Sequence, residues 1–318
     1  MLHAGRGHRR RASRPRRPAQ SLSTQQTIRR RVLRGIALNR RPGLHFPGSF
    51  LGVLFDRVSR SGARLSLDAG PWTRDAGGET HMAALTVLAD LALGASIRVQ
   101  LAPETRLATV SLGLQFTGAP RTGRLRAQGE FQGFFARGAG RLGMSRVAVR
   151  GSAGLVCFGT GTFMALQPPK DVTLHPVPFR RRGSAEPAGL NEKELSAEEK
   201  GILQRADAAL AARGNFIENF WGGAHELENG LHVGNRVGHA QGGIQIGMAA
   251  SNATAALPPG WTLSGITALY VSPGEGRSLR ANSKVVHLGR LTAVVRTRIT
   301  GKNRRRVLEV VTTHNATA

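Results

Sequence analysis

Asp90 is the side chain whose type and surroundings most strongly indicate chemistry. It lies in the run 81–96, in which nearly every other residue is apolar. A helix that is apolar on all faces is usually buried, and a carboxylate buried there loses its hydration unless another group pairs with it. Such carboxylates often belong to active sites, although an aspartate on a solvated stripe of the helix, or one bonded to backbone amides, fits the run as well. We therefore take Asp90 as a candidate catalytic carboxylate.

The residues before Asp90 form a motif. Residues 75–83 read Asp-Ala-Gly-Gly-Glu-Thr-His-Met-Ala, and Asp90 follows His81 by nine residues. This resembles the signature Asn-x-x-Gly-x-x-His-Gly-Gly of hotdog-fold acyl-CoA thioesterases of the phenylacetate-pathway (PaaI-like) type, which have their catalytic Asp at the same spacing. Asp75 replaces the Asn of that signature, and Met-Ala replaces its paired glycines. The resemblance covers about residues 48–166, where the later stretches read like the family's strands in order.

The second half of the chain carries the same motif with different losses. Residues 235–243 read Asn-Arg-Val-Gly-His-Ala-Gln-Gly-Gly, which keeps the Asn, the Gly and the paired glycines. Gln241 stands where the signature has His, and Ala250 stands where the catalytic Asp would fall. The two halves have therefore lost complementary parts of one signature.

Two short matches also indicate an internal duplication. A Leu-Arg-Ala recurs at 125–127 and 279–281, and a Gly-Arg recurs at 140–141 and 289–290. A repeat that occurs twice over more than a hundred residues indicates fused domains. The predicted fold class is α+β: two tandem hotdog units, each a curved antiparallel sheet around a long helix, joined edge to edge as an intrachain pseudo-dimer.

The resemblance implies one composite site. In hotdog thioesterases one unit supplies the carboxylate, and the other supplies the Asn and a backbone amide at the start of its helix. Here Asp90 of the first half would face Asn235 and Gly242 of the second. The opposite pairing has Ala250 in place of a carboxylate, so we expect one active and one inactive site.

The roles of the candidate residues follow from the resemblance and from thioester chemistry. The N–H of Gly242, at the positive end of a helix dipole, would stabilise the oxyanion of the thioester carbonyl. Asn235 would bind or align that carbonyl, and Asp90 would act as general base or as nucleophile. Thr109 falls where the family positions the water with a hydroxyl. Three further residues are expected at the substrate: Gln241, Gly243 and Arg290.

The composition divides the chain into four segments. Residues 1–43 are Arg-rich and are predicted to be a disordered extension. Hotdog domain 1 is placed at 44–167, a linker at 168–213 and hotdog domain 2 at 214–318. The linker is predicted to contain a helix that begins with a Ser-Ala-Glu-Glu capping box at 196–199. The extension is interpreted as a polyanion-binding tail, a transit peptide or upstream sequence from a misplaced start codon. Its removal should leave activity intact.

The net charge of +26 is unevenly distributed. Residues 1–41 hold 13 of the arginines and no acidic residue, and the rest of the chain has a net charge of +13. A moderate surplus suits the phosphates of coenzyme A, so we expect an acyl-CoA as partner, and nucleic-acid contact only nonspecifically through the extension.

The remaining features restrict the class of protein. The single cysteine, Cys157, excludes an intrachain disulfide and lies in an apolar stretch, where it is expected as a buried filler. No apolar run reaches the roughly 18 residues of a membrane span, and the histidines lack metal-ligand spacing. We expect a cytoplasmic homo-oligomer of double hotdogs without metal or separate cofactor.

The predicted function is hydrolysis of an acyl-CoA to a free acid and coenzyme A. A hotdog hydratase or dehydratase would need a Gly-Asp-x-Asn-x-x-His motif, which the sequence lacks. A non-catalytic acyl-CoA-binding protein is the alternative, and a basic nucleic-acid binder is a distant one.

Overall fold

The computed structural model describes residues 22–137, 140–168, 170 and 173–317, and within them the chain forms two units with a similar order of elements. The first unit is a short helix, two strands, a long helix and four strands. These are α2 (Phe46–Leu51), β1 (Leu54–Ser59), β2 (Gly62–Asp68), α3 (Met82–Arg98), β3 (Arg106–Phe116), β4 (Arg124–Phe134), β5 (Arg141–Gly151) and β6 (Gly154–Leu166).

The second unit repeats this order with a single short strand before its long helix. Its elements are α5 (Phe216–Trp221), β7 (Glu226–Glu228), α6 (Gly242–Ala255), β8 (Trp261–Tyr270), β9 (Ser278–Leu288), β10 (Thr292–Thr300) and β11 (Arg306–Ala316). Two helices and two 3-10 turns complete the described chain. These are α1 (Thr24–Asn39), α4 (Ala197–Ala211), η1 (Glu192–Glu194) and η2 (Lys302–Arg304).

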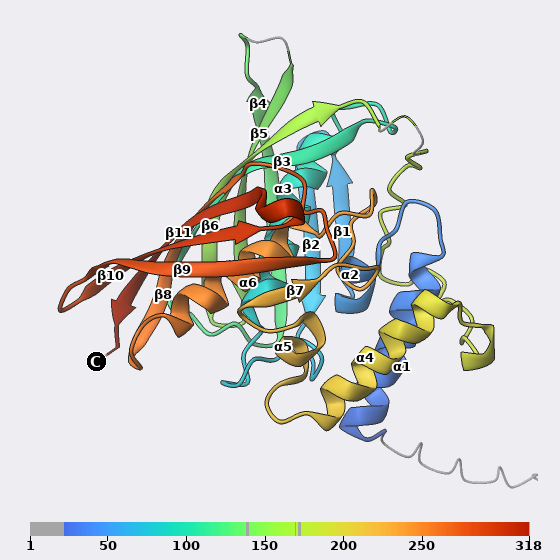
Figure 1. Cartoon of the computed structure of the whole chain (residues 1–318). Coiled ribbons are helices and arrows are strands. Elements are labelled where there is room, and N and C mark those ends of the chain that lie inside the picture. The colour runs from blue at the N-terminus through green and yellow to red at the C-terminus, as the bar shows by residue number, and fades with distance from the viewer. Residues whose placement is uncertain (1–21, 138–139, 169, 171–172, 318) are drawn as a thin grey trace, which may run out of the picture.

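The described strands form one antiparallel sheet of eleven (Figure 1). Their order is β1-β2-β4-β5-β6-β3-β8-β11-β10-β9-β7. Strand β3 pairs with β8 from Ser111, opposite Leu269, to Gln115, opposite Gly265. The two units are thus joined edge to edge, and neither strand at the junction exposes an unpaired edge. The tandem architecture and the α+β class are confirmed.

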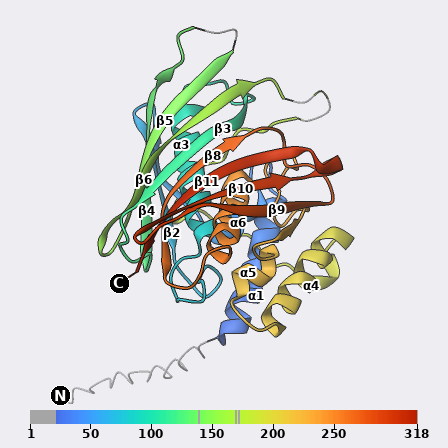
Figure 2. The same cartoon turned by 60° about the vertical axis from the view of Figure 1, so that its left-hand side comes forward.

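The long helices α3 and α6 pack against each other on the face around which the sheet curves (Figure 2). Glycines on α6 permit the close approach: a Cβ on Gly243 would lie 2.5 Å from the backbone nitrogen of Val87, and one on Gly247 would lie 2.4 Å from the Cα of Ala83. Thr86 Oγ1 donates to the Gly243 carbonyl across this contact at 2.6 Å. The crossing fixes the first turns of α3 beside the first turns of α6.

Helix α1 corrects the prediction that residues 1–43 are disordered. Ser23 and Gln26 form a capping box at its start. Apolar side chains at four-residue spacing join the main core: Ile28, Val32 and Ile36. Residues 1–21 lie outside the described part of the chain, so the prediction is tested only from residue 22 onward. The first folded unit therefore includes residues that composition had assigned to the extension.

The arginines of this segment are stabilised by partners elsewhere in the chain. Arg29 pairs with Glu192 at 2.5 Å and Arg40 with Glu199 at 2.7 Å, both acids lying in the linker. The guanidinium of Arg31 donates to the carbonyl of Phe50 at 2.6 Å, at the end of α2. Because α2 lines the cavity described below, α1 supports the wall of that cavity.

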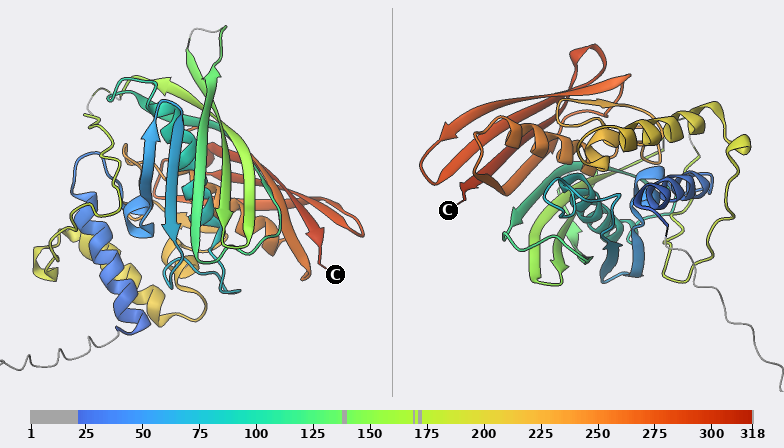
Figure 3. Two further views of the ribbon diagram at one scale, coloured as in Figure 1. Left: turned by 180° about the vertical axis from the view of Figure 1, so that it is seen from behind. Right: turned by 90° about the horizontal axis from the view of Figure 1, so that it is seen from below.

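The helix predicted in the linker is confirmed as α4, with Ser196 and Glu199 forming its capping box. Figure 3 shows α4 running beside α1, outside the curve of the sheet. No helix in residues 22–137, 140–168, 170 and 173–317 is long and apolar enough to cross a membrane.

Candidate active site

Asp90 lies at the junction of the two units. The residue is 8% exposed, and its carboxylate has one hydrogen bond from each unit. Thr109 Oγ1 of β3 donates to Oδ1 at 3.2 Å, and Gln241 Nε2, at the start of α6, donates to Oδ2 at 2.7 Å. Burial raises the pKa of Asp90 to about 6, because desolvation of the charge outweighs these two hydrogen bonds. Above that pH the group is an unusually basic carboxylate.

Gln241 links this carboxylate to the start of α6. It is the N-cap residue, and its Oε1 accepts the Ile244 N–H at 3.0 Å while its Nε2 bonds Asp90. The side-chain amide therefore contacts both units: its NH₂ donates to Asp90 of the first unit, and its oxygen accepts from the helix start of the second. The expected place of Gln241 near the substrate is compatible with its position on the cavity wall, but its visible contacts orient Asp90 and cap the helix.

Gly242 is the first residue of α6 and lines the same cavity. Among the described residues its N–H has no hydrogen-bond acceptor. A free N–H at a helix N-terminus is a donor for a developing negative charge, and the helix dipole adds to it. The geometry therefore sets a carboxylate of one unit beside a free amide donor of the other.

Tyr270, the chain's single tyrosine, is a site residue that the sequence analysis missed. Its hydroxyl donates to the Gly242 carbonyl at 2.8 Å, and a Cβ on Gly242 would lie 2.8 Å from that oxygen. Burial and the charge of Asp90 raise the pKa of Tyr270 well above its ordinary value, so it stays a protonated donor. No motif pointed to it, because it reaches the site from the end of β8.

Asn235 holds the loop that leads into α6. Its Oδ1 accepts the N–H groups of Val237 at 2.9 Å and His239 at 3.2 Å. The residue also lines the cavity. In the first unit Asp75 holds the corresponding loop: its Oδ1 accepts the Glu79 N–H at 3.0 Å. The visible role of Asn235 is therefore structural, and a contact with substrate stays a prediction.

The cavity has a volume of about 460 Å³ and is lined by both units. Asp90, Thr109, Asn235, Gln241 and Gly242 all line it, so the structure brings together these five predicted residues. Its size is in the range of small-molecule sites.

Two predicted substrate contacts lie elsewhere. Gly243 is buried in the crossing of α3 and α6, where its missing side chain lets the helices approach. Arg290 is exposed in the turn between β9 and β10 and does not line the cavity. Cys157 is buried, with its pKa raised to about 12 by desolvation, as expected of a filler rather than a nucleophile.

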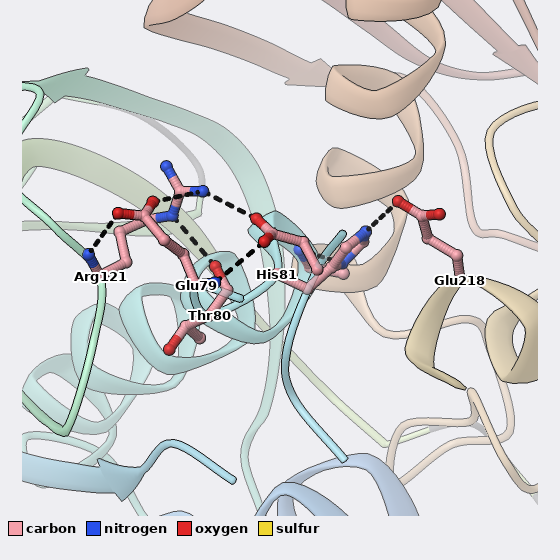
Figure 4. A network of polar contacts seen from close by, with 7 residues as sticks. Glu79, Thr80, His81, Arg121 and Glu218 are labelled. Carbon is pink, nitrogen blue, oxygen red and sulfur yellow. Dashed lines mark hydrogen bonds and ion pairs between the residues drawn. The ribbon is translucent and has the colours of Figure 1, made fainter. Parts of the chain in front are cut away.

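The position related to this site by the repeat is closed. Its residual cavity measures about 20 Å³ and is lined by His81, where the open site has Gln241. His81 caps α3, its Nδ1 accepting the Ala83 N–H at 3.2 Å, and its Nε2 lies 3.5 Å from Glu218 of α5 (Figure 4). Ala250 is buried in α6 and supplies no carboxylate.

Ion pairs hold the loop before this closed position. Arg121 lies 2.9 Å from both Asp75 and Glu79, and its Nε donates to the Thr80 carbonyl at 3.0 Å (Figure 4). The structure thus has one open cavity and one closed position, and the expectation that only the open one is active stays a prediction.

Comparisons with known proteins bear on the fold. No protein-family model matches the sequence, and no curated protein matches it. Among solved structures, a Lactobacillus plantarum protein described as "oleoyl thioesterase (putative)" is 9% identical with a TM-score of 0.51, covering 80% of this chain and 96% of its own.

Two further structures align over similar shares. A TesB protein from Mycobacterium avium subspecies paratuberculosis is 11% identical with a TM-score of 0.47, covering 83% of this chain and 96% of its own. A conserved protein with the hotdog fold from Alicyclobacillus acidocaldarius is 8% identical with a TM-score of 0.48, covering 80% and 93%. The alignment with the Lactobacillus plantarum structure covers more of this chain than either unit alone, and the chain has the hotdog fold in tandem.

Proposed function

We propose that the open cavity hydrolyses an acyl-CoA thioester to a free acid and coenzyme A. The observation that carries the proposal is the juxtaposition across the two units: the buried carboxylate of Asp90 and the free N–H of Gly242 line one cavity. Gln241 ties the two together, since it bonds Asp90 and caps the helix that Gly242 begins.

The free N–H provides the electrostatic part of the reaction. When the thioester carbonyl is attacked, its oxygen becomes negative, and a fixed donor in a site shielded from water stabilises that charge. Gly242 offers this donor at the positive end of α6. Tyr270 holds the adjoining carbonyl of Gly242, so the donor is held in a fixed orientation before the substrate arrives.

Asp90 acts in this proposal either as the general base or as the nucleophile. As general base it takes a proton from water while the water oxygen bonds the carbonyl carbon; collapse then breaks the C–S bond, and the thiolate leaves and takes up the proton. As nucleophile its oxygen would bond the carbonyl carbon directly and expel the thiolate, and water would then hydrolyse the anhydride. A pKa of about 6 supports either role, because the group is ionised at neutral pH yet more basic than an ordinary carboxylate.

A thiol-release assay tests the proposal with two matched aspartates. The substrates are short, medium, long and aryl acyl-CoAs. Asp90→Asn changes the open site, and Asp75→Asn makes the same change in the loop of the closed position, where it restores the Asn of the signature. We expect a loss of about a thousandfold or more in kcat for Asp90→Asn, the scale of losing a principal catalytic group, and a change of less than about threefold for Asp75→Asn.

The outcomes separate hydrolysis from binding alone. Saturable acyl-CoA binding with no thiol release from the unmodified protein would favour the non-catalytic alternative. Equal activity in Asp90→Asn and the unmodified protein would refute the assignment of the site.

A further inference from the structure

The open cavity has an excess of positive charge that the reaction does not use. Among the described residues, Asp90 is the single acidic group that lines it, whereas four arginines do. Arg180 is paired with Glu186 at 2.7 Å. The other three form no ion pair with any residue of the described chain: Arg98, Arg106 and Arg236. Cationic side chains gathered in a cavity without acidic partners indicate an anionic ligand.

Arg98 lies on the same face of α3 as Asp90. Gly94 and Arg98 follow Asp90 at intervals of four residues, which places the Cα of Arg98 about 12 Å further along the helix axis. Arg98 Nη1 donates to the Thr105 carbonyl at 2.9 Å. Burial, and then the charge of Arg236, lower the pKa of Arg98 to about 10.

Arg236 approaches the same region from the second unit. It follows Asn235 in the loop before α6, and its guanidinium donates to the His175 carbonyl of the linker. Burial lowers the pKa of Arg236, and its charge acts on His45, whose pKa burial and Arg236 together lower to about 4. Two cations and a neutral histidine therefore share one wall of the cavity.

This arrangement is unfavourable without a counter-charge. Two like charges that are partly withdrawn from water each lose some hydration and repel one another. The backbone carbonyls of Thr105 and His175 orient the guanidinium groups but carry no net charge. An anion that arrives with the ligand would relieve both costs.

The closed position lacks these arginines. When the two motifs are aligned on His81 and Gln241, the counterpart of Arg236 is Ala76, and the counterpart of Arg98 is Pro258. The charge is thus a feature of the open cavity alone and not of the repeated framework.

We propose that Arg98 and Arg236 bind a carboxylate carried by the acyl group, so that the cavity takes CoA thioesters of dicarboxylic acids. This inference rests on the proposed thioester hydrolysis. A cavity of about 460 Å³ suits one ligand of moderate size, which leaves the larger, highly charged nucleotide of coenzyme A outside. Its walls are mostly apolar around the arginines, with Leu44, Leu174 and Val177 among them, which matches a methylene chain that ends in one charge.

The test compares acyl groups of equal length with and without a terminal carboxylate. Adipyl-CoA is paired with hexanoyl-CoA, and succinyl-CoA with butyryl-CoA. We expect the unmodified protein to prefer a carboxylated member by at least about tenfold in kcat/KM, a difference of about 1.4 kcal/mol. Arg98→Met and Arg236→Met should each lower kcat/KM for that member by about thirtyfold or more, and for its neutral partner by less than about threefold. Arg98→Lys should retain part of the preference, because it keeps the charge.

A second arm removes the phosphates of the coenzyme. The same acyl groups are offered as pantetheine thioesters. If the arginines bind the acyl carboxylate, the preference and its loss in the variants persist on pantetheine. In the opposite outcome, Arg98→Met and Arg236→Met lower kcat/KM equally for both CoA thioesters of a pair and have no effect on pantetheine thioesters. The arginines would then bind a phosphate of coenzyme A, and the inference would be overturned. Arg150→Met, an exposed arginine of β5 outside the cavity lining, is the matched control, and melting temperatures establish that each variant folds.

A third arm separates this inference from the proposed function. Binding of free adipate and of hexanamide, a six-carbon counterpart without a carboxylate, is measured by calorimetry, which needs no turnover. Adipate binding that is lost in Arg98→Met supports the subsite even if no thioester is cleaved. Turnover without any preference for a carboxylated acyl group, and without adipate binding, leaves the hydrolysis standing and overturns the subsite.

Discussion

Replacing Asp90 with Asn should stabilise the protein at neutral pH while abolishing its activity. Asp90 is 8% exposed and its pKa is about 6, against an ordinary value of 3.8. Holding the ionised form in the fold therefore costs about 3 kcal/mol. Asparagine carries no charge to desolvate. The oxygen of the substituted side chain can still accept from Thr109. Its NH₂ group, however, faces the NH₂ of Gln241, so the hydrogen bond between residues 90 and 241 is lost at a cost of about 1 kcal/mol. The net expectation is a gain of about 2 kcal/mol in the free energy of unfolding.

The pH dependence of this gain follows from the sign of the shift. A carboxyl group whose pKa is raised in the folded state destabilises the fold only where the unfolded chain would ionise it. The cost is absent below pH 3.8, grows between there and about 6, and is complete above it. Asp90→Asn should therefore be more stable than the unmodified protein at pH 7.5. At pH 4 it should be about as stable, or less stable by the lost hydrogen bond.

Urea unfolding at pH 4, 5.5 and 7.5 measures this directly, with melting temperatures as a second readout. Asp75→Asn is the control, because Asp75 is ion-paired with Arg121 rather than desolvated. It should lower stability at pH 7.5 by about 1 kcal/mol or less. If Asp90→Asn is no more stable than the unmodified protein at pH 7.5, or if its effect does not change with pH, the carboxylate is not held at a desolvation cost and the reasoning fails.

Three further predictions concern the site and its support. The kcat/KM for thioester cleavage should fall as the pH drops through about 6, because protonated Asp90 can serve neither as base nor as nucleophile; a profile flat from pH 5 to 8 would exclude Asp90 as the titrating group. Tyr270→Phe removes the donor to the Gly242 carbonyl and should lower kcat by about tenfold, the value of one hydrogen bond of about 1.4 kcal/mol, with an unchanged kcat counting against the orienting role. Deletion of residues 1–41 removes α1 from the core. It should abolish the cooperative melting transition that circular dichroism records in the full chain, and a transition that persists would show that α1 is dispensable.

The sequence was informative wherever an isolated residue contradicted its surroundings. Asp90 in an apolar run predicted a buried carboxylate, and the spacing of His81 and Asp90 placed it on a long helix. The two copies of the motif have lost complementary residues, and the second has Gln241 and Ala250 in place of the His and the Asp. This predicted that the start of the second unit's long helix would face Asp90. These inferences succeeded because they depended on spacing within one helix and on the match between two copies of a motif, and each copy is a short stretch of the chain.

The missed features depend on contacts between distant segments. Tyr270 reaches Gly242 from the end of β8, and Arg98 and Arg236 converge from different units. No spacing in the chain encodes such meetings. Gly243 was assigned to the substrate because the motif pairs it with Gly242, but the helix crossing requires it.

The error at residues 22–43 had a different cause. The Arg-rich composition of that segment indicated disorder, but it hid an apolar residue at every fourth position and the Ser23–Gln26 capping box. The arginines of that segment appear unpaired in the composition, but Arg29 and Arg40 form ion pairs with Glu192 and Glu199 of the linker. Periodicity within the segment was a signal that could have revealed the helix.

The central claim is that one thioester binds between Asp90 of the first unit and Gly242 of the second. A crystal structure of Asp90→Asn soaked with an acyl-CoA that this variant cannot turn over measures this most directly. The account predicts a thioester carbonyl within hydrogen-bond distance of the Gly242 N–H, with residue 90 facing the carbonyl carbon. An acyl-CoA bound with its thioester beside His81 and Glu218, or outside the cavity altogether, would contradict it.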